Sequence, residues 1–304
     1  MDFEIAIIGG GPAGLAAGLY AARARRKVIL FEGEAIGGQA ATTDRVANYP
    51  GFEEIAGFEL TAKMEEQAKK LGVQVEYTRA GGLTQENRNF VIATSKGNFT
   101  SSKVIVASGV APKKLGVEGE DRYLGRGVSY CATCDGAFFR DKEVLVVGGG
   151  DSAVEEAIFL TRFATKVGIV HRRDELRATK IVQEEARANP KLNFFYNRVI
   201  VGLKGDEALT KAVLKDVQSG ALEEVATHGV FVYIGNLPRT EFLTGFLELS
   251  PEGYIPTDER MRTMRPGLFA AGDVRTKSLR QIVTAVADGA IAAVEADREL
   301  TGGI

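Results

Sequence analysis

Hydrophobic positions at the amino end of the chain form one short unbroken run, followed by glycines and then by small and apolar residues at helical spacing. Residues 3–8 predict a buried strand, and residues 12–25 predict a helix that starts directly after the glycines. Residues 28–32 are again apolar and predict a second strand. The sequence therefore predicts a βαβ unit, in which a helix joins two parallel strands.

The same pattern returns in the middle of the chain. It predicts a strand, a helix and a strand at residues 143–147, 153–163 and 166–171. Gly9 lies 23 positions before Glu32, and Gly148 lies 23 positions before His171, so the two copies agree in length as well as in pattern. The repeat predicts two units of the kind that bind dinucleotides.

Further periodic segments lie between and after the two units. An amphipathic helix is expected at residues 59–71, and strands are expected at residues 73–77, 90–94, 104–107, 230–233 and 268–271. The last helix has apolar residues at four-residue spacing, which predict a continuous buried face: Ile282, Val286, Ala290 and Val294. The predicted fold class is α/β, with two Rossmann-like dinucleotide-binding domains, each built in three layers.

Composition excludes several classes of function. The 304 residues suffice for two domains, and 45% hydrophobic with 26% charged residues is ordinary for a globular chain. The formal net charge is -2 without a long basic run, so neither nucleic acid nor a membrane is an expected partner. The amino end is unlike a secretory signal, and no apolar run is long enough to span a membrane. The 36 glycines indicate loops in which the backbone approaches a ligand.

The first glycine-rich loop has the spacing Gly9-x-Gly11-x-x-Gly14. In such loops the first glycine permits a tight turn, the second lets the backbone approach a pyrophosphate, and the third lets helix and strand pack closely. The N-terminus of the following helix stabilises phosphate charge. Because this loop joins a predicted strand to a predicted helix, with Glu32 at the ribose position, a dinucleotide site is favoured over a structural turn.

The second loop has Ala153 in place of the third glycine and differs most at the ribose position. Where the first unit has an acid, the second has the basic run 171–173, with Arg177 one turn further on. Arginines form charge-assisted hydrogen bonds to a 2′-phosphate, whereas a carboxylate accepts hydrogen bonds from a free 2′-hydroxyl. This reversal of charge predicts NADPH rather than NADH. The alternative is a basic strand end that is simply solvated.

Only two cysteines occur, Cys131 and Cys134, shortly before the second glycine loop. They make no framework of the kind found in small secreted domains, so a reducing cytoplasm is the expected location. Because C-x-x-C spacing closes a small ring and lowers the pKa of the reactive thiol, it favours a redox pair. Asp135 follows directly and can shuttle the proton that thiol exchange requires.

Three alternatives stay open for these residues. A zinc site needs about four ligands, and only His171 and His228 remain among the soft donors, so no metal is expected. Spacing alone does not exclude two buried, inert cysteines, and Asp135 could instead be a turn residue before Gly136. Two nucleotide sites and a dithiol on one chain nevertheless favour an electron relay, in which a bound flavin takes hydride from the other nucleotide and the dithiol accepts electrons.

Six motifs are more specific than these patterns. They are Gly37-Gly38-Gln39, Asn48-Tyr49-Pro50-Gly51, Cys131-Ala132-Thr133-Cys134-Asp135-Gly136, Gly148-Gly149-Gly150-Asp151-Ser152-Ala153, residues 171–178 (HRRDELRA) and Phe269-Ala270-Ala271-Gly272-Asp273. In their order and spacing, from end to end, the chain resembles the low-molecular-weight bacterial thioredoxin reductases, which are class II pyridine nucleotide-disulfide oxidoreductases. Departures are few: Ser108 replaces the family's usual threonine, and Ala137 stands where some members have an aromatic residue.

The resemblance implies an NADPH-binding domain inserted into an FAD-binding domain, in a homodimer. The FAD domain is expected at residues 1–112 and 242–304, and the NADPH domain, with the dithiol, at residues 113–241, with hinges near Lys113 and Thr240. The residues expected to bind FAD are Gly9, Gly11, Pro12, Ala13, Gly14, Glu32, Gly38, Gln39, Asn48, Gly109, Gly272, Asp273, Arg280 and Gln281. Those expected to bind NADPH are Gly148, Gly150, Asp151, Ser152, Ala153, His171, Arg172, Arg173 and Arg177.

The resemblance also implies a route for electrons. Hydride passes from NADPH to FAD, and electrons then reduce the Cys131–Cys134 disulfide, with Cys134 nearest the flavin and oxidised thioredoxin as the final acceptor. Phe138 and Phe139 match a family segment near the docking surface for that partner, although paired phenylalanines are more often core residues. The sequence leaves open which sulfur attacks the partner.

Three other readings are weaker. A ferredoxin or flavodoxin reductase would not need the dithiol. The reductase half of an alkyl hydroperoxide reductase needs an amino-terminal extension, whereas here the FAD loop begins at Gly9. A nucleotide-binding redox sensor without turnover would keep every motif, and only a turnover assay separates it from an enzyme.

Overall fold

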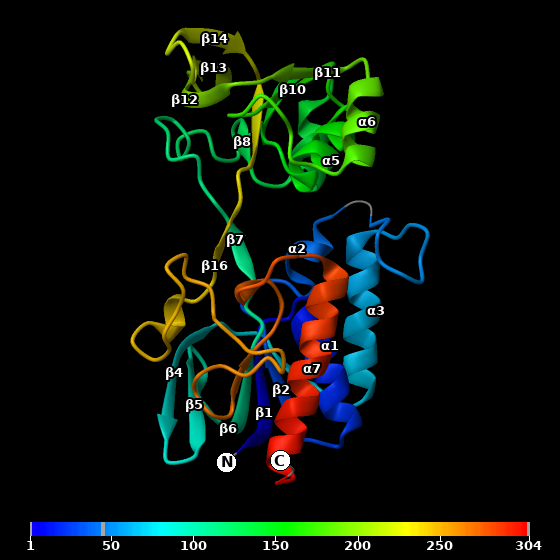
Figure 1. Ribbon diagram of the computed structural model, residues 1–304, viewed down its shortest axis with the longest axis vertical. Coiled ribbons are helices and arrows are strands. Elements are labelled where there is room, and N and C mark those ends of the chain that lie inside the picture. The colour runs from blue at the N-terminus through cyan, green and yellow to red at the C-terminus, as the bar shows by residue number, and fades with distance from the viewer. Residues whose placement is uncertain (1, 44–45, 303–304) are drawn as a thin grey trace. The chain divides into compact units, whose positions relative to one another are not determined.

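The computed structural model describes residues 2–43 and 46–302, and the chain forms two compact units. Unit 1 comprises Met1–Ala111 and Leu237–Ile304, and unit 2 comprises Pro112–Asn236. One unit is therefore inserted into the sequence of the other, as expected (Figure 1). From the sequence, the inserted domain was expected at residues 113–241, whereas unit 2 comprises Pro112–Asn236.

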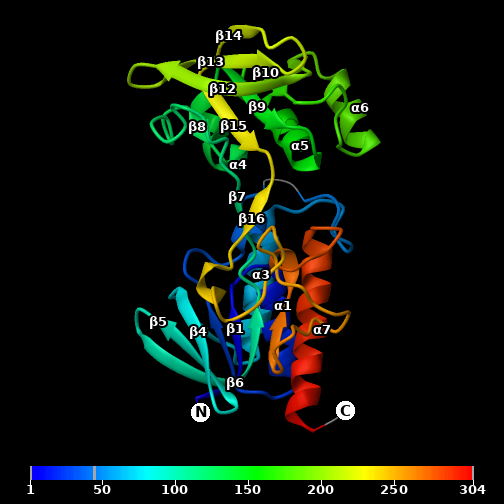
Figure 2. The same cartoon turned by 60° about the vertical axis from the view of Figure 1, so that its left-hand side comes forward.

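A seven-stranded sheet forms the centre of unit 1 (Figure 2). Its strands are β1 (Phe3–Ile8), β2 (Val28–Phe31), β3 (Gln74–Glu76), β4 (Ala80–Glu86), β5 (Asn89–Thr94), β6 (Gly97–Val106) and β17 (Leu268–Ala270). The order is β3-β2-β1-β6-β5-β4, and β17 also pairs with β6. The strands β1, β2, β3, β6 and β17 pair in parallel, whereas β4 and β5 add an antiparallel hairpin.

Helices cover one face of this sheet and loops cover the other. Helices α1 (Pro12–Arg23) and α7 (Ile282–Leu300) lie side by side, and α3 (Gly57–Lys70) also packs on α1, preceded by the short α2 (Gly38–Ala41) (Figure 1). Ile5 and Ile7 of β1 belong to the core on the helical face, whereas Ala6 and Ile8 belong to the core beneath the loops. Burial on both faces explains why this strand is an unbroken apolar run.

The buried face of α7 is not the one that its apolar spacing predicted. Ile282, Val286 and Ala290 are partly exposed and Val294 is 37% exposed. The buried residues are mostly small: Ala285, Gly289, Ala292, Ala293 and Ala296. A Cβ added at Gly289 would lie 2.0 Å from the Ala13 carbonyl oxygen of α1. Because the two helices approach so closely, small side chains face the core and larger apolar ones are displaced outward.

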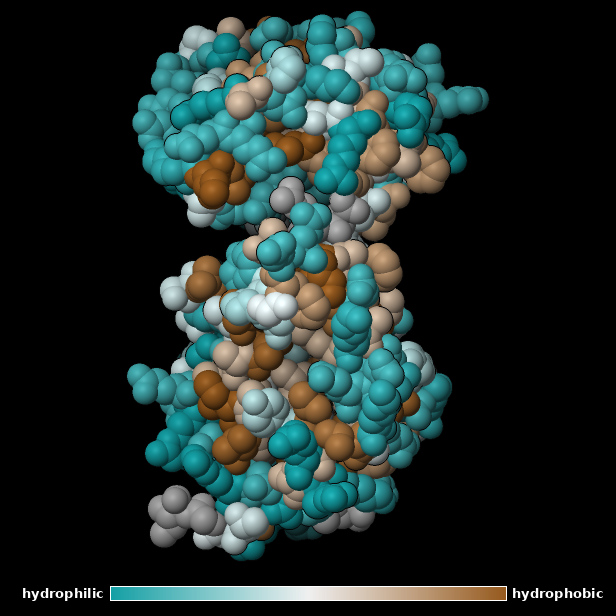
Figure 3. Space-filling view, turned by 90° about the vertical axis from the view of Figure 1, so that its right-hand side faces the viewer, coloured by the Kyte–Doolittle hydropathy of each residue, from teal (hydrophilic) through white to brown (hydrophobic). Residues whose placement is uncertain are grey.

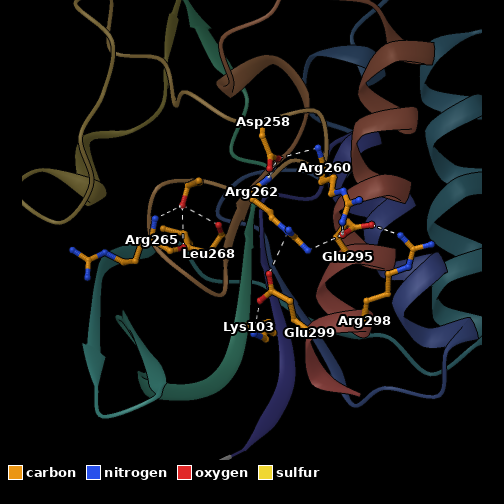
Figure 4. A network of polar contacts seen from close by, with 10 residues as sticks. Lys103, Asp258, Arg260, Arg262, Arg265, Leu268, Glu295, Arg298 and Glu299 are labelled. Carbon is orange, nitrogen blue, oxygen red and sulfur yellow. Dashed lines mark hydrogen bonds and ion pairs between the residues drawn. The ribbon is translucent and has the colours of Figure 1, made fainter. Parts of the chain in front are cut away.

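An ion-pair network fastens α7 to the rest of unit 1 (Figure 4). The buried Glu295 carboxylate lies 3.0 Å from Arg262 Nη2 and 2.5 Å from Arg298 Nη1. One turn further on, Glu299 accepts a 2.6 Å hydrogen bond from Lys103 Nζ of β6. Since more than one cation faces Glu295, its buried negative charge is compensated.

Unit 2 also has three layers. Its parallel sheet contains β8 (Val128–Ser129), β9 (Glu143–Gly148), β10 (Lys166–Val170), β11 (Leu192–Phe195) and β15 (Gly229–Tyr233), in the order β11-β10-β9-β15-β8. One face is covered by α4 (Ala132–Asp135), α5 (Asp151–Leu160) and α6 (Lys180–Ala188). The other is covered by an antiparallel sheet of β12 (Arg198–Gly205), β13 (Leu209–Asp216) and β14 (Leu222–Ala226).

Both predicted βαβ units are present, and their elements differ from the prediction mainly at the ends. Helix α1 ends at Arg23 because Arg25 has a left-handed φ of 63°. Helix α5 ends at Leu160, where turn hydrogen bonds such as Phe163 N to Leu160 O, 3.0 Å, replace the helix. Where the chain passes between the units, β7 (Val110–Pro112) pairs with β16 (Asn236–Pro238). No helix in the described part of the chain is long and apolar enough to cross a membrane.

The close contact between α1 and α7 generates a test of the fold. We expect Gly289→Ala to destabilise the protein by about 1–3 kcal/mol, because the new methyl group would overlap backbone atoms of α1. Gly18→Ala is the matched control, since the nearest atoms that its Cβ would meet are all side-chain atoms, of Val73 from 3.4 Å and of Ile7 at 3.7 Å, and it should be neutral or stabilising. Thermal unfolding followed by circular dichroism measures both. Equal stability of the two variants would contradict this packing argument.

Candidate functional site

The first glycine loop brings backbone atoms together at the end of β1. A Cβ at Gly9 would lie 2.3 Å from the Ala107 carbonyl oxygen, and one at Gly14 would lie 1.8 Å from the Gly9 carbonyl oxygen. A Cβ at Gly11, by contrast, would meet nothing within 4 Å. Gly11 is the N-cap of α1 and provides no side-chain cap, so the first N–H groups of the helix are available to an anion.

Glu32 lies beside this loop at the carboxyl end of β2. Its Oε2 accepts a 2.7 Å hydrogen bond from Gly10 N, and its Oε1 accepts one of 2.7 Å from Glu34 N. These two bonds fix the carboxylate next to the glycine loop. Each oxygen keeps a further lone pair with which it can accept a hydrogen bond from a ribose hydroxyl.

Asp273 lies in the 3-10 turn η3 (Gly272–Val274) that follows β17. Its Oδ1 is buried and has no hydrogen-bond partner among the described residues. Burial raises the pKa of the Asp273 carboxyl, while the charges of Lys277 and Arg280 act in the opposite direction. A buried oxygen without a partner is costly, and this one fits a site that a bound group completes.

A buried carboxylate that the sequence analysis missed holds this turn in place. Asp288 of α7 accepts hydrogen bonds from Gly272 N at 3.1 Å, Lys277 Nζ at 2.7 Å and Arg275 Nη1 at 3.2 Å. The turn that carries Asp273 is thereby fastened to α7. The available signal was an acid on a helix face otherwise made of small residues, between Ala285 and Ala292.

The remaining residues expected to bind FAD lie in unit 1 and connect the same segments. Gln39 Nε2 donates to Val110 O at 2.8 Å, and Asn48 Nδ2 donates to Gln281 Oε1 at 3.0 Å. Arg280 Nε donates to Asp273 O at 3.3 Å. The other expected residues are neighbours of the first glycine loop or of α1. Pro12 opens α1, and Gly109 follows the end of β6. A Cβ at Gly38 would lie 3.4 Å from Gly11 Cα, and a Cβ at Gly272 would lie 2.8 Å from Ala13 Cβ.

The second glycine loop repeats the backbone arrangement in unit 2. A Cβ at Gly148 would lie 2.4 Å from the Tyr233 carbonyl oxygen, whereas one at Gly150 would meet nothing within 4 Å. Gly150 is the uncapped N-cap of α5, followed by Asp151, exposed Ser152 and buried Ala153. As in unit 1, helix N–H groups are left available to a phosphate.

The basic segment beside this loop carries exposed arginines on a fixed backbone. The side chains of Arg172, Arg173 and Arg177 are exposed, and none of them donates a hydrogen bond to a described residue or forms an ion pair with one. His171 is buried, and a Cβ at Gly149 would lie 2.4 Å from its ring. Burial lowers the pKa of the His171 imidazole, and the charge of Arg177 lowers it further, so the ring is neutral at neutral pH.

Cys131 and Cys134 are joined in a disulfide, with 5.3 Å between their Cα atoms. Cys134 is exposed and Cys131 is partly exposed, which rules out two buried, inert cysteines. Cys134 N lies 3.2 Å from Cys131 Sγ, so in the reduced pair an N–H placed in this way would stabilise negative charge on the Cys131 sulfur. Asp135 is partly exposed, ends α4, and is helical rather than part of an open turn.

Polar side chains hold the disulfide segment from both sides. Ser129 Oγ accepts from Cys131 N at 3.0 Å, and the Tyr233 hydroxyl accepts from Ala132 N at 2.8 Å. Tyr233 also supplies the carbonyl oxygen that faces Gly148, so one residue contacts both the disulfide segment and the glycine loop. Burial raises the pKa of the Tyr233 hydroxyl, which keeps it protonated. The sequence analysis did not identify this residue.

The two phenylalanines after the disulfide differ in environment. Phe138 is 74% exposed, whereas Phe139 is buried and its ring lies 5.1 Å from that of Phe231, edge to face. For Phe139 the structure supports the alternative that the sequence left open, a core residue, because its ring also packs on Gly229. Phe138 alone is available to a partner.

Comparison with known proteins assigns these features to a family. A family model described as pyridine nucleotide-disulphide oxidoreductase matches residues 3–289. The chain is 52% identical to a thioredoxin reductase of Peptoclostridium litorale over 97% of this chain and 96% of that protein. It is 48% identical to the thioredoxin reductase of Bacillus subtilis, over 96% of this chain and 92% of that protein.

A solved structure agrees with the fold over almost the whole chain. The thioredoxin reductase of Lactococcus lactis, described as the FR conformation, superposes with a TM-score of 0.97 at 46% identity and covers 99% of both chains. Within unit 2, the disulfide lies between Ser129 and the tyrosine that faces the second glycine loop. The chain belongs to the low-molecular-weight thioredoxin reductases of the pyridine nucleotide-disulphide oxidoreductase family, flavoproteins that depend on FAD and NAD(P)H and use a redox disulfide, here Cys131–Cys134.

Proposed function

We propose that the chain reduces the disulfide of thioredoxin, or of a thioredoxin-like protein, with electrons that NADPH supplies through bound FAD. The observation that carries the proposal is an accessible C-x-x-C disulfide in the same unit as a glycine loop flanked by exposed arginines. Names of the similar proteins support thioredoxin as the substrate. The reducing cytoplasm, where such exchange runs toward thiols, is the proposed location.

Unit 1 is the proposed FAD domain and unit 2 the proposed NADPH domain. The residues of unit 1 fit a flavin dinucleotide because the loop at Gly11 is open, Glu32 can accept a hydrogen bond from ribose, and Asp273 Oδ1 has no partner in the described part of the chain. When bound, FAD accepts hydride and passes two electrons to the disulfide. Gln39, Asn48, Arg280 and Gln281 are proposed to orient it, as the resemblance implies.

In the exchange step, one thiolate of the reduced pair attacks a sulfur of the partner disulfide. The partner's S–S bond breaks, a mixed disulfide forms, and the partner's other sulfur leaves and receives the proton that the attacking thiol gave up, which Asp135 can carry from one sulfur to the other. The second cysteine then attacks the mixed disulfide, which releases the dithiol partner and restores the Cys131–Cys134 bond. The N–H of Cys134 favours charge on the Cys131 sulfur.

Cysteine variants test this relay directly. Cys131→Ser and Cys134→Ser should each abolish thioredoxin-dependent oxidation of NADPH, because neither can close the disulfide, while NADPH still bleaches the bound flavin. Ala137→Ser, on an exposed neighbour, should keep full turnover. Flavin absorbance in stopped flow and steady-state NADPH oxidation measure the two steps. Undiminished turnover in either cysteine variant would refute the relay, and flavin reduction without thioredoxin turnover in the unmodified enzyme would shift the search to another disulfide partner.

Donor preference is tested at the basic segment. The double variant Arg172→Ala, Arg173→Ala should lower kcat/KM for NADPH by at least about 100-fold, since each charge-assisted hydrogen bond contributes about 1.5–3 kcal/mol. The value for NADH should change by less than about twofold, because NADH has no 2′-phosphate. Arg88→Ala, an exposed arginine of unit 1, is the control. Equal losses with both donors would overturn the assignment of NADPH.

We also propose that the enzyme is a homodimer, and that its interface includes the outer surface of α1 and α7. Figure 3 shows hydrophobic residues gathered on one face of unit 1 between hydrophilic ones. Along the two helices, Tyr20, Ile291 and Val294 are 44%, 38% and 37% exposed and line one shallow depression. Exposed apolar side chains that cluster in this way are typical of association surfaces.

Sedimentation velocity tests the dimer. Ile291→Glu should shift the FAD-loaded enzyme from dimer to monomer at micromolar concentration, because two such charges would be buried near the interface centre. Leu222→Glu, at a more exposed leucine of β14 in unit 2, should leave the dimer intact. A monomeric unmodified enzyme would refute the dimer, whereas an Ile291→Glu dimer would refute this location for the interface.

A further inference from the structure

The backbone that carries Arg177 has an irregular conformation, yet it is held on both sides. It lies between β10 and α6, outside any helix or strand. Leu176 and Ala178 are buried while Arg177 between them is exposed, so only the arginine side chain reaches solvent. A segment of this kind keeps one conformation only if its backbone N–H and carbonyl groups find partners elsewhere.

The N–H groups are bound to the glycine loop. Arg177 N and Ala178 N donate to the Gly149 carbonyl oxygen at 2.6 Å and 3.0 Å. Thr179 N donates to Asp151 Oδ1 at 2.7 Å. The position of Arg177 is therefore tied to the loop that receives the pyrophosphate.

The carbonyl groups are bound by a single buried amide. Gln183 of α6 is 3% exposed, and its Nε2 donates to Ala178 O at 2.7 Å and to Leu176 O at 3.3 Å. These are the carbonyls on either side of Arg177. The other end of the amide, Oε1, accepts a hydrogen bond from Arg187 Nη2 at 3.1 Å, so both polar atoms of the amide have partners.

Glutamine is unusual on the buried face of a helix, because an unpaired amide there would be costly. An apolar residue would pack with Ala186, the other buried residue of α6, but would leave two buried carbonyl groups without this donor. The glutamine at this position is therefore explained by the hydrogen bonds that it makes to the segment of Arg177, and not by the packing of α6.

We propose that Gln183 is a positioning residue for the choice of nucleotide: it fixes Arg177 for the 2′-phosphate of an adenosine ribose. This inference rests on the proposed NADPH function. The guanidinium of Arg177 has no ion pair or hydrogen bond with any described residue, so it is ready to bind a phosphate. Without the Gln183 bonds, the segment would sample other conformations, and ordering it again would weaken binding of the phosphorylated nucleotide alone.

The test compares nucleotides that differ only in the 2′-phosphate. In Gln183→Met, calorimetry on the FAD-loaded full chain should give a dissociation constant for NADP⁺ about tenfold higher, as expected for the loss of about two buried hydrogen bonds. The constant for NAD⁺ should change by less than about twofold. The ratio of kcat/KM for NADPH over NADH should fall by the same factor, while KM for thioredoxin stays unchanged.

Two control variants separate positioning from general damage to α6. Thr161→Val removes the hydroxyl that accepts from Asn189 Nδ2 at 3.0 Å, at the other end of α6, and should leave the nucleotide ratio unchanged. In an Arg177→Ala background, Gln183→Met should have no further effect on the ratio, because the side chain that it positions is gone. Gln183→Leu serves as a second apolar variant if the methionine protein does not fold.

Each outcome decides between the possibilities. Equal weakening of NADP⁺ and NAD⁺, or an effect of Gln183→Met that persists in full without Arg177, would overturn the positioning role. If Arg177→Ala itself leaves the NADP⁺ to NAD⁺ ratio unchanged, the proposed use of NADPH at this segment fails instead. Selective loss in Gln183→Met, abolished by Arg177→Ala, supports the inference.

Discussion

Both glycine loops, the proposed nucleotide sites, depend on a contact of backbone with backbone, at the point where a strand ends and a helix begins. A Cβ at Gly14 would lie 1.8 Å from a carbonyl oxygen of its own loop, and one at Gly148 would lie 2.4 Å from a carbonyl oxygen of β15. With no side chain between them, sheet and helix meet closely and the first helical N–H groups stay uncovered. The packing of α7 on α1 at Gly289 follows the same rule, so the geometry of unit 1 is set by contacts that tolerate no added methyl group.

Next to the glycine loops, buried polar residues hold in place the irregular segments that contain Asp273, the disulfide and Arg177. Asp288 fastens the turn of Asp273, Tyr233 receives the N–H of Ala132, and Gln183 binds the carbonyls beside Arg177. None of these three is itself expected to touch a reacting atom. Each compensates backbone groups that have no strand or helix to pair with, and thereby fixes a functional side chain whose own polar atoms remain available.

The sequence predicted what depends on local pattern and missed what depends on contacts across the fold. Both βαβ units, the glycine loops and the disulfide pair occupy the expected residues, because tight turns and short spacings are encoded in adjacent positions. The buried face of α7 was assigned wrongly, since apolar spacing does not reveal how near another helix lies. Asp288, Tyr233 and Gln183 were invisible for the same reason: their partners lie on other segments of the chain. The different environments of Phe138 and Phe139 likewise became apparent only from the packing of Phe139 on Phe231.

The inserted arrangement of the two units also orders events during synthesis. Unit 2 is complete once Asn236 has left the ribosome, whereas unit 1 still lacks β17, the turn of Asp273 and the whole of α7. Domains generally fold as units in the order in which they are made. The nascent chain can therefore form the second glycine loop and the cysteine pair before the turn of Asp273 and helix α7 have been made, so the proposed flavin site is completed later than the unit that carries the disulfide.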